Sequence, residues 1–179
     1  FVYDDIAKHA LGDWQSPAMT VLWALIDPVA PGPGSMFLLI ATTYWVGFGL
    51  LAFTIARRSV RLAALVPILA LAPPAFVFVG MIWRDMLFAT SWLLAAVIAF
   101  GAAGCGGKLR LTVQVVVTVL CAFGVLLRPN ALIAAPILGA YIAWPTAFYW
   151  KRAAITFMPA MALFFVLIQL VYYGRGFLA

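Results

Sequence analysis

An unbroken apolar run occupies residues 35–56, SMFLLIATTYWVGFGLLAFTIA, and residues 57–61, RRSVR, follow it with three arginines. A helix needs about 20 mostly apolar residues to cross a hydrocarbon core about 30 Å thick. In lipid, every backbone polar group has to be hydrogen-bonded within the protein, so the run predicts a helix rather than an open strand. Similar runs follow at residues 62–82, 86–104, 111–128, 131–149 and 153–173. The sequence therefore predicts an all-α, polytopic integral membrane protein with about six transmembrane helices.

The composition excludes a soluble globular domain. Hydrophobic residues make up 67% of the chain and charged residues only 9%, whereas soluble domains carry about 25% charged residues. The chain opens with Phe1 and has no cleavable signal pattern, so we expect a further segment upstream.

The basic residues indicate how the predicted helices are oriented, because cytoplasmic loops of membrane proteins carry an excess of Lys and Arg. Alternation places three short loops on one side, and they contain seven basic residues and no acidic one: Arg57, Arg58, Arg61, Lys108, Arg110, Lys151 and Arg152. The opposite side contains the other basic residues and all five acidic ones: Lys8, Arg84, Arg128, Arg175, Asp4, Asp5, Asp13, Asp27 and Asp85. The net charge of +6 is thus a topology signal, and we expect no nucleic-acid partner.

The pattern divides the chain into two parts. Residues 1–34 form a predicted extracytoplasmic loop with interfacial helices, and residues 35–179 form the transmembrane bundle. The segment 17–27 is apolar but too short to cross, so we expect it to lie along the interface, with Trp14 and Trp23 at headgroup level.

Two features predict how the helices bend and pack. Pro73 and Pro74 should kink the second span. The small residues Ala95, Ala99 and Ala103 form one stripe of the third span, which predicts a close helix–helix contact.

The strongest candidate for chemistry is Tyr3-Asp4-Asp5. An ionised Asp4 or Asp5 can take a proton from an acceptor hydroxyl, or bind a hard divalent cation. An aspartate at the start of a helix also caps it, which explains the pair equally well. Both interpretations stay open, and they can apply to different members of the pair.

His9 and Asp13 follow Asp5 at intervals of four residues, on one face of a predicted helix. Three such groups suggest a metal site, but side chains spaced along a straight helix seldom reach one ion. We favour His9 as a hydrogen-bonded interfacial side chain. The cofactor is undetermined, although a divalent metal is compatible with the carboxylates.

Two short outer turns each carry an arginine. Arg84 and Asp85 precede the third span, where Asp85 can cap the helix and Arg84 can extend to lipid headgroups. Arg128 and Asn130 flank Pro129 between the fourth and fifth spans, and Arg128 can extend in the same way. The functional alternative is that Arg84 and Arg128 bind a phosphate, because the planar guanidinium fits its oxygens. Asn130 suits a sugar hydroxyl or the same phosphate.

This arrangement resembles the GT-C superfamily of membrane glycosyltransferases, and most closely its bacterial branch of protein O-mannosyltransferases and lipid A aminoarabinose transferases. The similar segments are Tyr3-Asp4-Asp5, Gly12-Asp13-Trp14-Gln15-Ser16-Pro17, Ile82-Trp83-Arg84-Asp85 and Leu127-Arg128-Pro129-Asn130-Ala131-Leu132. Relatives often have His-Pro where this chain has Ser16-Pro17, and a span usually precedes the aspartate pair.

The resemblance implies an inverting transfer of a sugar from a polyprenyl-phosphate donor to an acceptor hydroxyl, on the periplasmic face of the inner membrane. It implies that Asp4 or Asp5 is the base and that Arg84 and Arg128 contact the donor phosphate. The alternative from another class is a non-catalytic subunit of a larger membrane complex, with partner membrane subunits. A transporter would place ionisable residues at mid-span, and the chain has none there.

Overall fold

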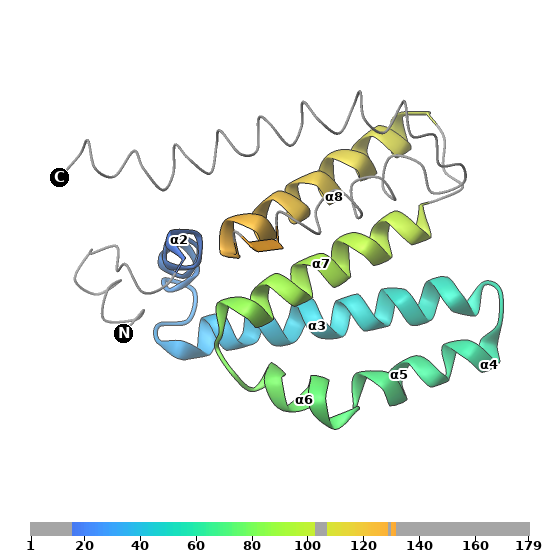
Figure 1. The fold of residues 1–179 in the computed structure, drawn as a ribbon, viewed down its shortest axis with the longest axis horizontal. Helices are drawn as coiled ribbons and strands as arrows, with labels where there is room; N and C mark the ends of the chain where they lie inside the picture. Colours follow the sequence, from blue (N-terminus) through green and yellow to red (C-terminus); the bar gives the residue numbers. More distant parts are fainter. Residues whose placement is uncertain (1–15, 103–106, 129, 132–179) are drawn as a thin grey trace.

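The computed structural model describes residues 16–102, 107–128, 130 and 131, which are arranged as in Figure 1. Every regular element in these residues is helical, and the longer ones are α2 Pro17–Ile26, α3 Pro33–Ala56, α4 Val60–Ala63, α5 Leu65–Ala70, α6 Pro73–Val79, α7 Arg84–Gly101 and α8 Gly107–Leu127. The predicted all-α class is confirmed for this part of the chain. The predicted spans 131–149 and 153–173, and residues 1–15 of the N-terminal segment, lie outside the described residues.

Two of these helices are long and apolar enough to cross a membrane. They are α3, with 24 residues, and α7, with 18 residues. The bent pair of α4–α5 and α6 adds a third candidate if the two pieces form one span. In α8 the apolar part, Leu111–Leu127, is shorter. The described residues thus contain two or three candidate spans.

Prolines divide the second predicted span into three short helices. Pro67 lacks the N–H group that would bond to the carbonyl of Ala63 in a continuous helix, and the chain passes from α4 to α5 just there. Pro73 and Pro74 occupy the first positions of α6, where a missing N–H costs little. The stretch Val60–Ala70, which contains α4 and α5, meets α6 at an angle of 57°. The predicted bend is confirmed, but the chain breaks and restarts there instead of continuing as one kinked helix.

A tyrosine of α3 compensates for this break. In a continuous helix the carbonyl of Ala70 would accept from the N–H of residue 74, which is proline. The Tyr44 hydroxyl donates a hydrogen bond to that carbonyl instead, and both residues are buried. Tyr44 therefore satisfies an acceptor that would otherwise be buried without a partner.

We expect Tyr44→Phe to lower the free energy of unfolding by about 1–3 kcal/mol, because it leaves the Ala70 carbonyl unsatisfied. The measurement is the thermal unfolding midpoint of the purified protein in detergent. Trp45→Phe is the matched control, since Trp45 lies next in α3 with its side chain exposed. Equal midpoints for the two variants would show that the hydrogen bond contributes nothing.

The helices α3, α7 and α8 pack side by side, with α7 between the other two (Figure 1). α3 and α7 run in the same direction, and α8 runs back. Two parallel neighbours require the chain to return the full length of the bundle between them. Helices α4 to α6 supply that return along α3.

Small residues make the contact between α7 and α8. Ala95 and Ala99 of α7 are buried against Val117 of α8, which confirms the predicted contact for these two alanines. Ala103, the third residue of the stripe, lies outside the described residues.

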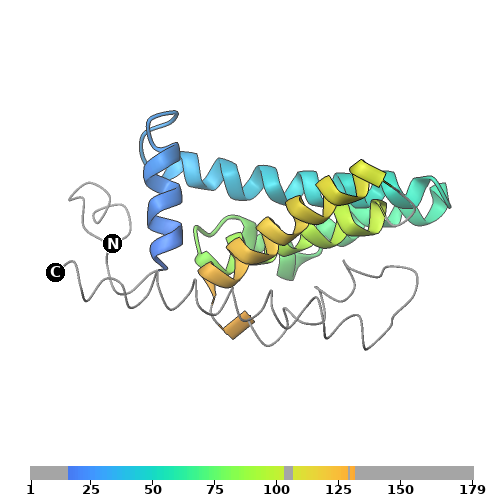
Figure 2. The same ribbon diagram turned by 90° about the horizontal axis from the view of Figure 1, so that it is seen from above.

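Helix α2 lies across one end of the bundle, as Figure 2 shows. At its start, the Ser16 hydroxyl donates to the carbonyl of Leu126, near the end of α8, at 2.8 Å. After its end, the Asp27 carboxylate accepts from the N–H of Gly32 at 2.9 Å, just before α3. Gly32 has φ of +101°, a backbone conformation that side chains disfavour. α2 is therefore fixed at both ends, to α8 and to α3.

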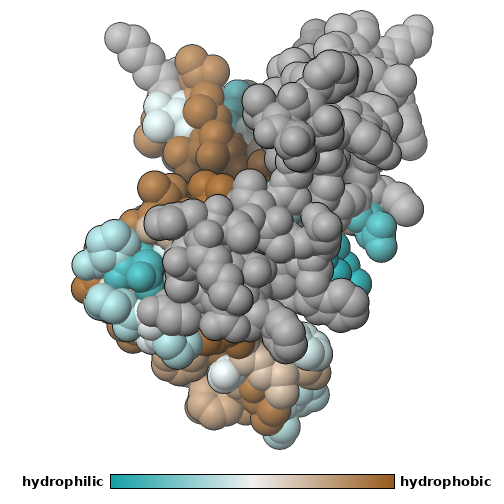
Figure 3. Space-filling view, turned by 90° about the vertical axis from the view of Figure 1, so that its left-hand side faces the viewer, coloured by the Kyte–Doolittle hydropathy of each residue, from teal (hydrophilic) through white to brown (hydrophobic). Residues whose placement is uncertain are grey.

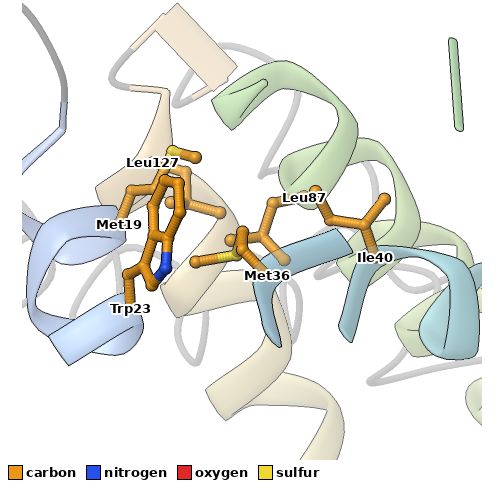
Figure 4. Packing of buried hydrophobic residues seen from close by; sticks show 6 residues of the cluster. All are labelled: Met19, Trp23, Met36, Ile40, Leu87 and Leu127. Atoms are coloured by element: carbon orange, nitrogen blue, oxygen red, sulfur yellow. The ribbon is translucent and has the colours of Figure 1, made fainter. Parts of the chain in front are cut away.

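A cluster of buried side chains fills the space beneath α2: Met19, Trp23, Met36, Ile40, Leu87 and Leu127 (Figure 4). These residues come from α2, α3, α7 and α8. The Trp23 side chain is only 4% exposed, and its indole N–H donates to the Gly32 carbonyl. The Trp23 side chain therefore faces inward from α2, while its expected position at headgroup level stays a prediction. Trp14 lies outside the described residues.

Elsewhere the surface is largely apolar, while small and polar residues are buried. Ile68 is 66% exposed, whereas Ser16 and Ser91 are at most 4% exposed. Viewed toward the α2 end, the described surface carries hydrophilic patches beside hydrophobic ones (Figure 3). Large exposed apolar side chains over several helices are typical of contact with lipid, which supports a membrane association.

Candidate functional site at the α2 end of the bundle

Charge is distributed unequally between the two ends of the bundle. Arg57, Arg58 and Arg61 lie at the end where α3 stops, and all three are exposed. Asp27 and Asp85, the only acidic residues in the described part, lie at the opposite end, where α3 and α7 begin. The predicted separation of carboxylates from the basic loops is thus confirmed for these residues.

At the purely basic end, the arginines stack on aromatic rings. The Arg57 guanidinium carbon lies 4.8 Å from the ring centre of Phe53, and that of Arg58 lies 5.5 Å from the ring centre of Phe100. Among the described residues, no carboxylate pairs with these arginines. The described part of this end therefore offers positive charge but no carboxylate that could act as a base.

At the α2 end, an ion pair joins two turns that are far apart in the sequence. Arg128 Nη1 lies 2.8 Å from Asp85 Oδ1, and the side chains are 48% and 39% exposed. Trp83 is the N-cap of α7, and Asp85 lies inside the first turn of the helix. The interpretation of Asp85 as the cap of this helix was wrong, because Trp83 occupies the N-cap position. The Asp85 carboxylate instead accepts a hydrogen bond from Arg128. The two predicted outer turns therefore meet.

The backbone on both sides of this ion pair is well supported. Leu87, two residues after Asp85, and Leu127, next to Arg128, are both buried in the cluster beneath α2. The Arg128 N–H donates to the Gly124 carbonyl at 3.0 Å, and the Arg128 carbonyl accepts from Ala131 at 2.9 Å. The backbone that carries the ion pair is thus held in place, although the two side chains reach the surface.

The same end carries side chains whose hydrogen-bond donors exceed the partners they have among the described residues. Arg84 is exposed, and no ion pair or hydrogen bond joins its side chain to another described residue. A guanidinium has five N–H donors, and Arg128 directs one of its nitrogens at Asp85. Asn130, two residues further on, is also exposed. Two guanidinium groups and an amide at one end of the bundle suit a phosphate with an attached polar group.

The remaining candidates fall outside this group. Asp4, Asp5, His9 and Asp13 lie outside the described residues. Asp27, which the sequence groups with the outer acids, holds the turn before α3 through Gly32. Among residues 16–102, 107–128, 130 and 131, no three His, Cys, Asp or Glu side chains gather as a metal site would require. The suggested metal set of Asp5, His9 and Asp13 lies outside these ranges and stays a prediction.

Ser16 is the residue at this end that the sequence analysis missed. Its hydroxyl is bonded to Leu126, two residues before Arg128. The end of α8 leaves carbonyl groups without helical partners, and Ser16 satisfies one of them. The signal was a small hydroxyl residue before Pro17, where a helix starts, but nothing in the sequence identifies its distant acceptor.

No family model matches the chain, and it matches no curated protein and no solved structure.

Proposed function

We propose that this chain is the membrane-embedded part of a GT-C-type glycosyltransferase. It moves a sugar from a polyprenyl-phosphate donor to an acceptor hydroxyl on the periplasmic face of the cell inner membrane. In this proposal the bundle has about six spans, and the α2 end is the periplasmic end, because the opposite end carries only basic residues.

The observation that carries the proposal is the ion pair between Asp85 and Arg128. It brings together two turns that are 43 residues apart and that each present an arginine. Arg84 is exposed beside it, and the Arg128 side chain is half-exposed. The phosphate of a polyprenyl phosphate lies at the membrane surface, and the planar guanidinium group binds phosphate oxygens through charge-assisted hydrogen bonds.

The hydrogen bond of Ser16 also supports the proposal. It fixes the start of α2 within two residues of Arg128. Asp5 is eleven residues upstream of Ser16, and an extended chain of that length covers up to about 36–40 Å. The intervening chain is therefore long enough for the aspartate pair to reach the arginines.

In the proposed reaction, the acceptor oxygen attacks the anomeric carbon of the donor sugar, and the bond from that carbon to the phosphate oxygen breaks. Asp4 or Asp5 takes the proton of the acceptor hydroxyl. Arg84 and Arg128 stabilise the negative charge that stays on the departing polyprenyl phosphate. Asn130 hydrogen-bonds to the phosphate or to a sugar hydroxyl, and the polyprenyl tail lies against the apolar helix surfaces, with the membrane lipid.

The first test is binding of polyprenyl phosphate, which requires no knowledge of the sugar. We expect the full chain in lipid nanodiscs to bind it, and Arg84→Gln and Arg128→Gln each to weaken binding about 10–100-fold. That range corresponds to the loss of one charge-assisted hydrogen bond. Arg57→Gln is the control, because Arg57 is an exposed arginine at the other end. The affinity of this variant for polyprenyl phosphate should equal that of the wild type.

The alternative proposal, a non-catalytic subunit of a larger complex, predicts a different outcome. The extensive apolar surface of α3, α5 and α6 suits partner helices as well as lipid. A subunit of this kind would not bind polyprenyl phosphate, and Arg57→Gln would behave like Arg84→Gln. Absence of binding to the wild-type chain, together with absence of sugar transfer, would exclude the enzyme.

A further inference from the structure

We infer that Asp85 is a positioning residue that orients the guanidinium of Arg128 for the donor phosphate. The inference rests on the proposed function and assigns Asp85 a part in it. The sequence suggests Asp85 as a helix cap, and the geometry gives it a different partner.

The contact has the form expected of a positioning pair. Asp85 lies in the first turn of α7, where the positive end of the helix dipole favours a carboxylate. Arg128 follows directly after α8, whose end is fixed by the buried Leu127. The Nη1–Oδ1 distance of 2.8 Å is that of a charge-assisted hydrogen bond. One edge of the guanidinium is therefore held, while its other N–H groups have no partner among the described residues.

Two effects of Asp85 on phosphate binding oppose each other. The carboxylate repels an incoming phosphate, but at a side-chain exposure of 39% water screens this repulsion strongly. The carboxylate also restricts the many rotamers of Arg128 before the ligand arrives, and this ordering no longer has to occur during binding. We expect the orienting effect to exceed the repulsion. Because the pair is half-exposed, it contributes little to folding stability, so variants at Asp85 should fold.

The test is a double-mutant cycle on binding of polyprenyl phosphate to the full chain in nanodiscs. With Arg128 present, Asp85→Asn should weaken binding about tenfold, a coupling typical of residues in contact. In the Arg128→Gln background, Asp85→Asn should leave the affinity unchanged or raise it, because only the repulsion remains. Asp85→Glu, which keeps the charge, should restore most of the affinity, and Asp27→Asn serves as a control carboxylate outside the pair.

Each outcome has a separate meaning. If the wild-type chain binds polyprenyl phosphate but Asp85→Asn has the same effect in both backgrounds, Asp85 does not act through Arg128 and the inference is wrong. Tighter binding by Asp85→Asn in the wild-type background would show that repulsion dominates, which also overturns it. If the wild-type chain neither binds polyprenyl phosphate nor transfers sugar, the proposed function itself fails, and this inference fails with it. Thermal midpoints of all variants identify any loss caused by unfolding.

Discussion

Gly124→Ala is expected to lower the free energy of unfolding by about 1–3 kcal/mol, as overpacking of a tight contact does. A Cβ atom on Gly124 would overlap Nε1 and Cδ1 of the Trp92 indole, and would lie 3.1 Å from Cδ2 of Phe88. The indole has little freedom to move away, because its N–H donates to the Cys121 carbonyl and its ring contacts Phe88. The alanine must therefore push α7 and α8 apart or break that hydrogen bond. Thermal unfolding in detergent measures the loss.

Two further variants separate this clash from the general effect of placing alanine in a helix. Gly49 lies in α3, and a Cβ atom there would have no neighbour within 4 Å, so Gly49→Ala should be neutral or stabilise by up to about 1 kcal/mol. In a Trp92→Leu background, the indole that causes the most severe overlap is gone, and the additional cost of Gly124→Ala should be smaller. An undiminished cost in that background would mean that the indole is not what excludes the side chain.

At the aspartate pair, we expect one of the two substitutions Asp4→Asn and Asp5→Asn to lower the rate of glycosyl transfer by about 10²–10⁴-fold. That is the usual contribution of a positioned general base. Asparagine is nearly isosteric with aspartate but cannot accept the proton. The substitution at the other member should retain most of the rate. The measurement is transfer of labelled sugar from polyprenyl-phosphate sugars by the full chain.

Turnover, with stability as the control, tells the two aspartates apart. Loss of a helix cap costs about 0.5–2 kcal/mol, and asparagine caps about as well as aspartate, so neither variant should unfold the protein. A fall in turnover with an unchanged thermal midpoint identifies the base. Wild-type turnover in both variants would rule out either aspartate as the base and leave the pair with a capping role.

The helices could be predicted because the physics that produces them is local. The apolar run 35–56 is long enough to require a helix in lipid, and α3 covers it. Pro73 and Pro74 lack the N–H groups that a continuous helix needs, so the break between α5 and α6 is visible in the sequence. The alanine stripe likewise predicted a close helix–helix contact, because small side chains let two helices approach closely, and the structure shows that the partner is α8.

The side-chain partners could not be predicted, since they depend on how each helix is rotated about its axis. A helix that is apolar on all sides gives no periodic signal that fixes this rotation. The sequence placed Asp85 and Arg128 on the same side of the membrane, but it could not show that they touch. For the same reason, the sequence could not show that Tyr44 donates to the Ala70 carbonyl, or that Ser16 donates to the Leu126 carbonyl. The burial of Trp23 was not visible in the sequence either, because an aromatic residue near a membrane surface suits both the interface and the interior.

The hydrogen bond from Tyr44 to Ala70 has a consequence for biosynthesis. The hydroxyl lies 26 residues upstream of the carbonyl, so the ribosome delivers the donor before the acceptor. Because a bare carbonyl in hydrocarbon costs on the order of several kcal/mol, the proposed membrane topology implies that the broken segment inserts most easily once α3 is already in the bilayer. A circularly permuted gene encoding α4–α6 ahead of α3 would reverse this sequence of events, and it should yield less correctly inserted protein.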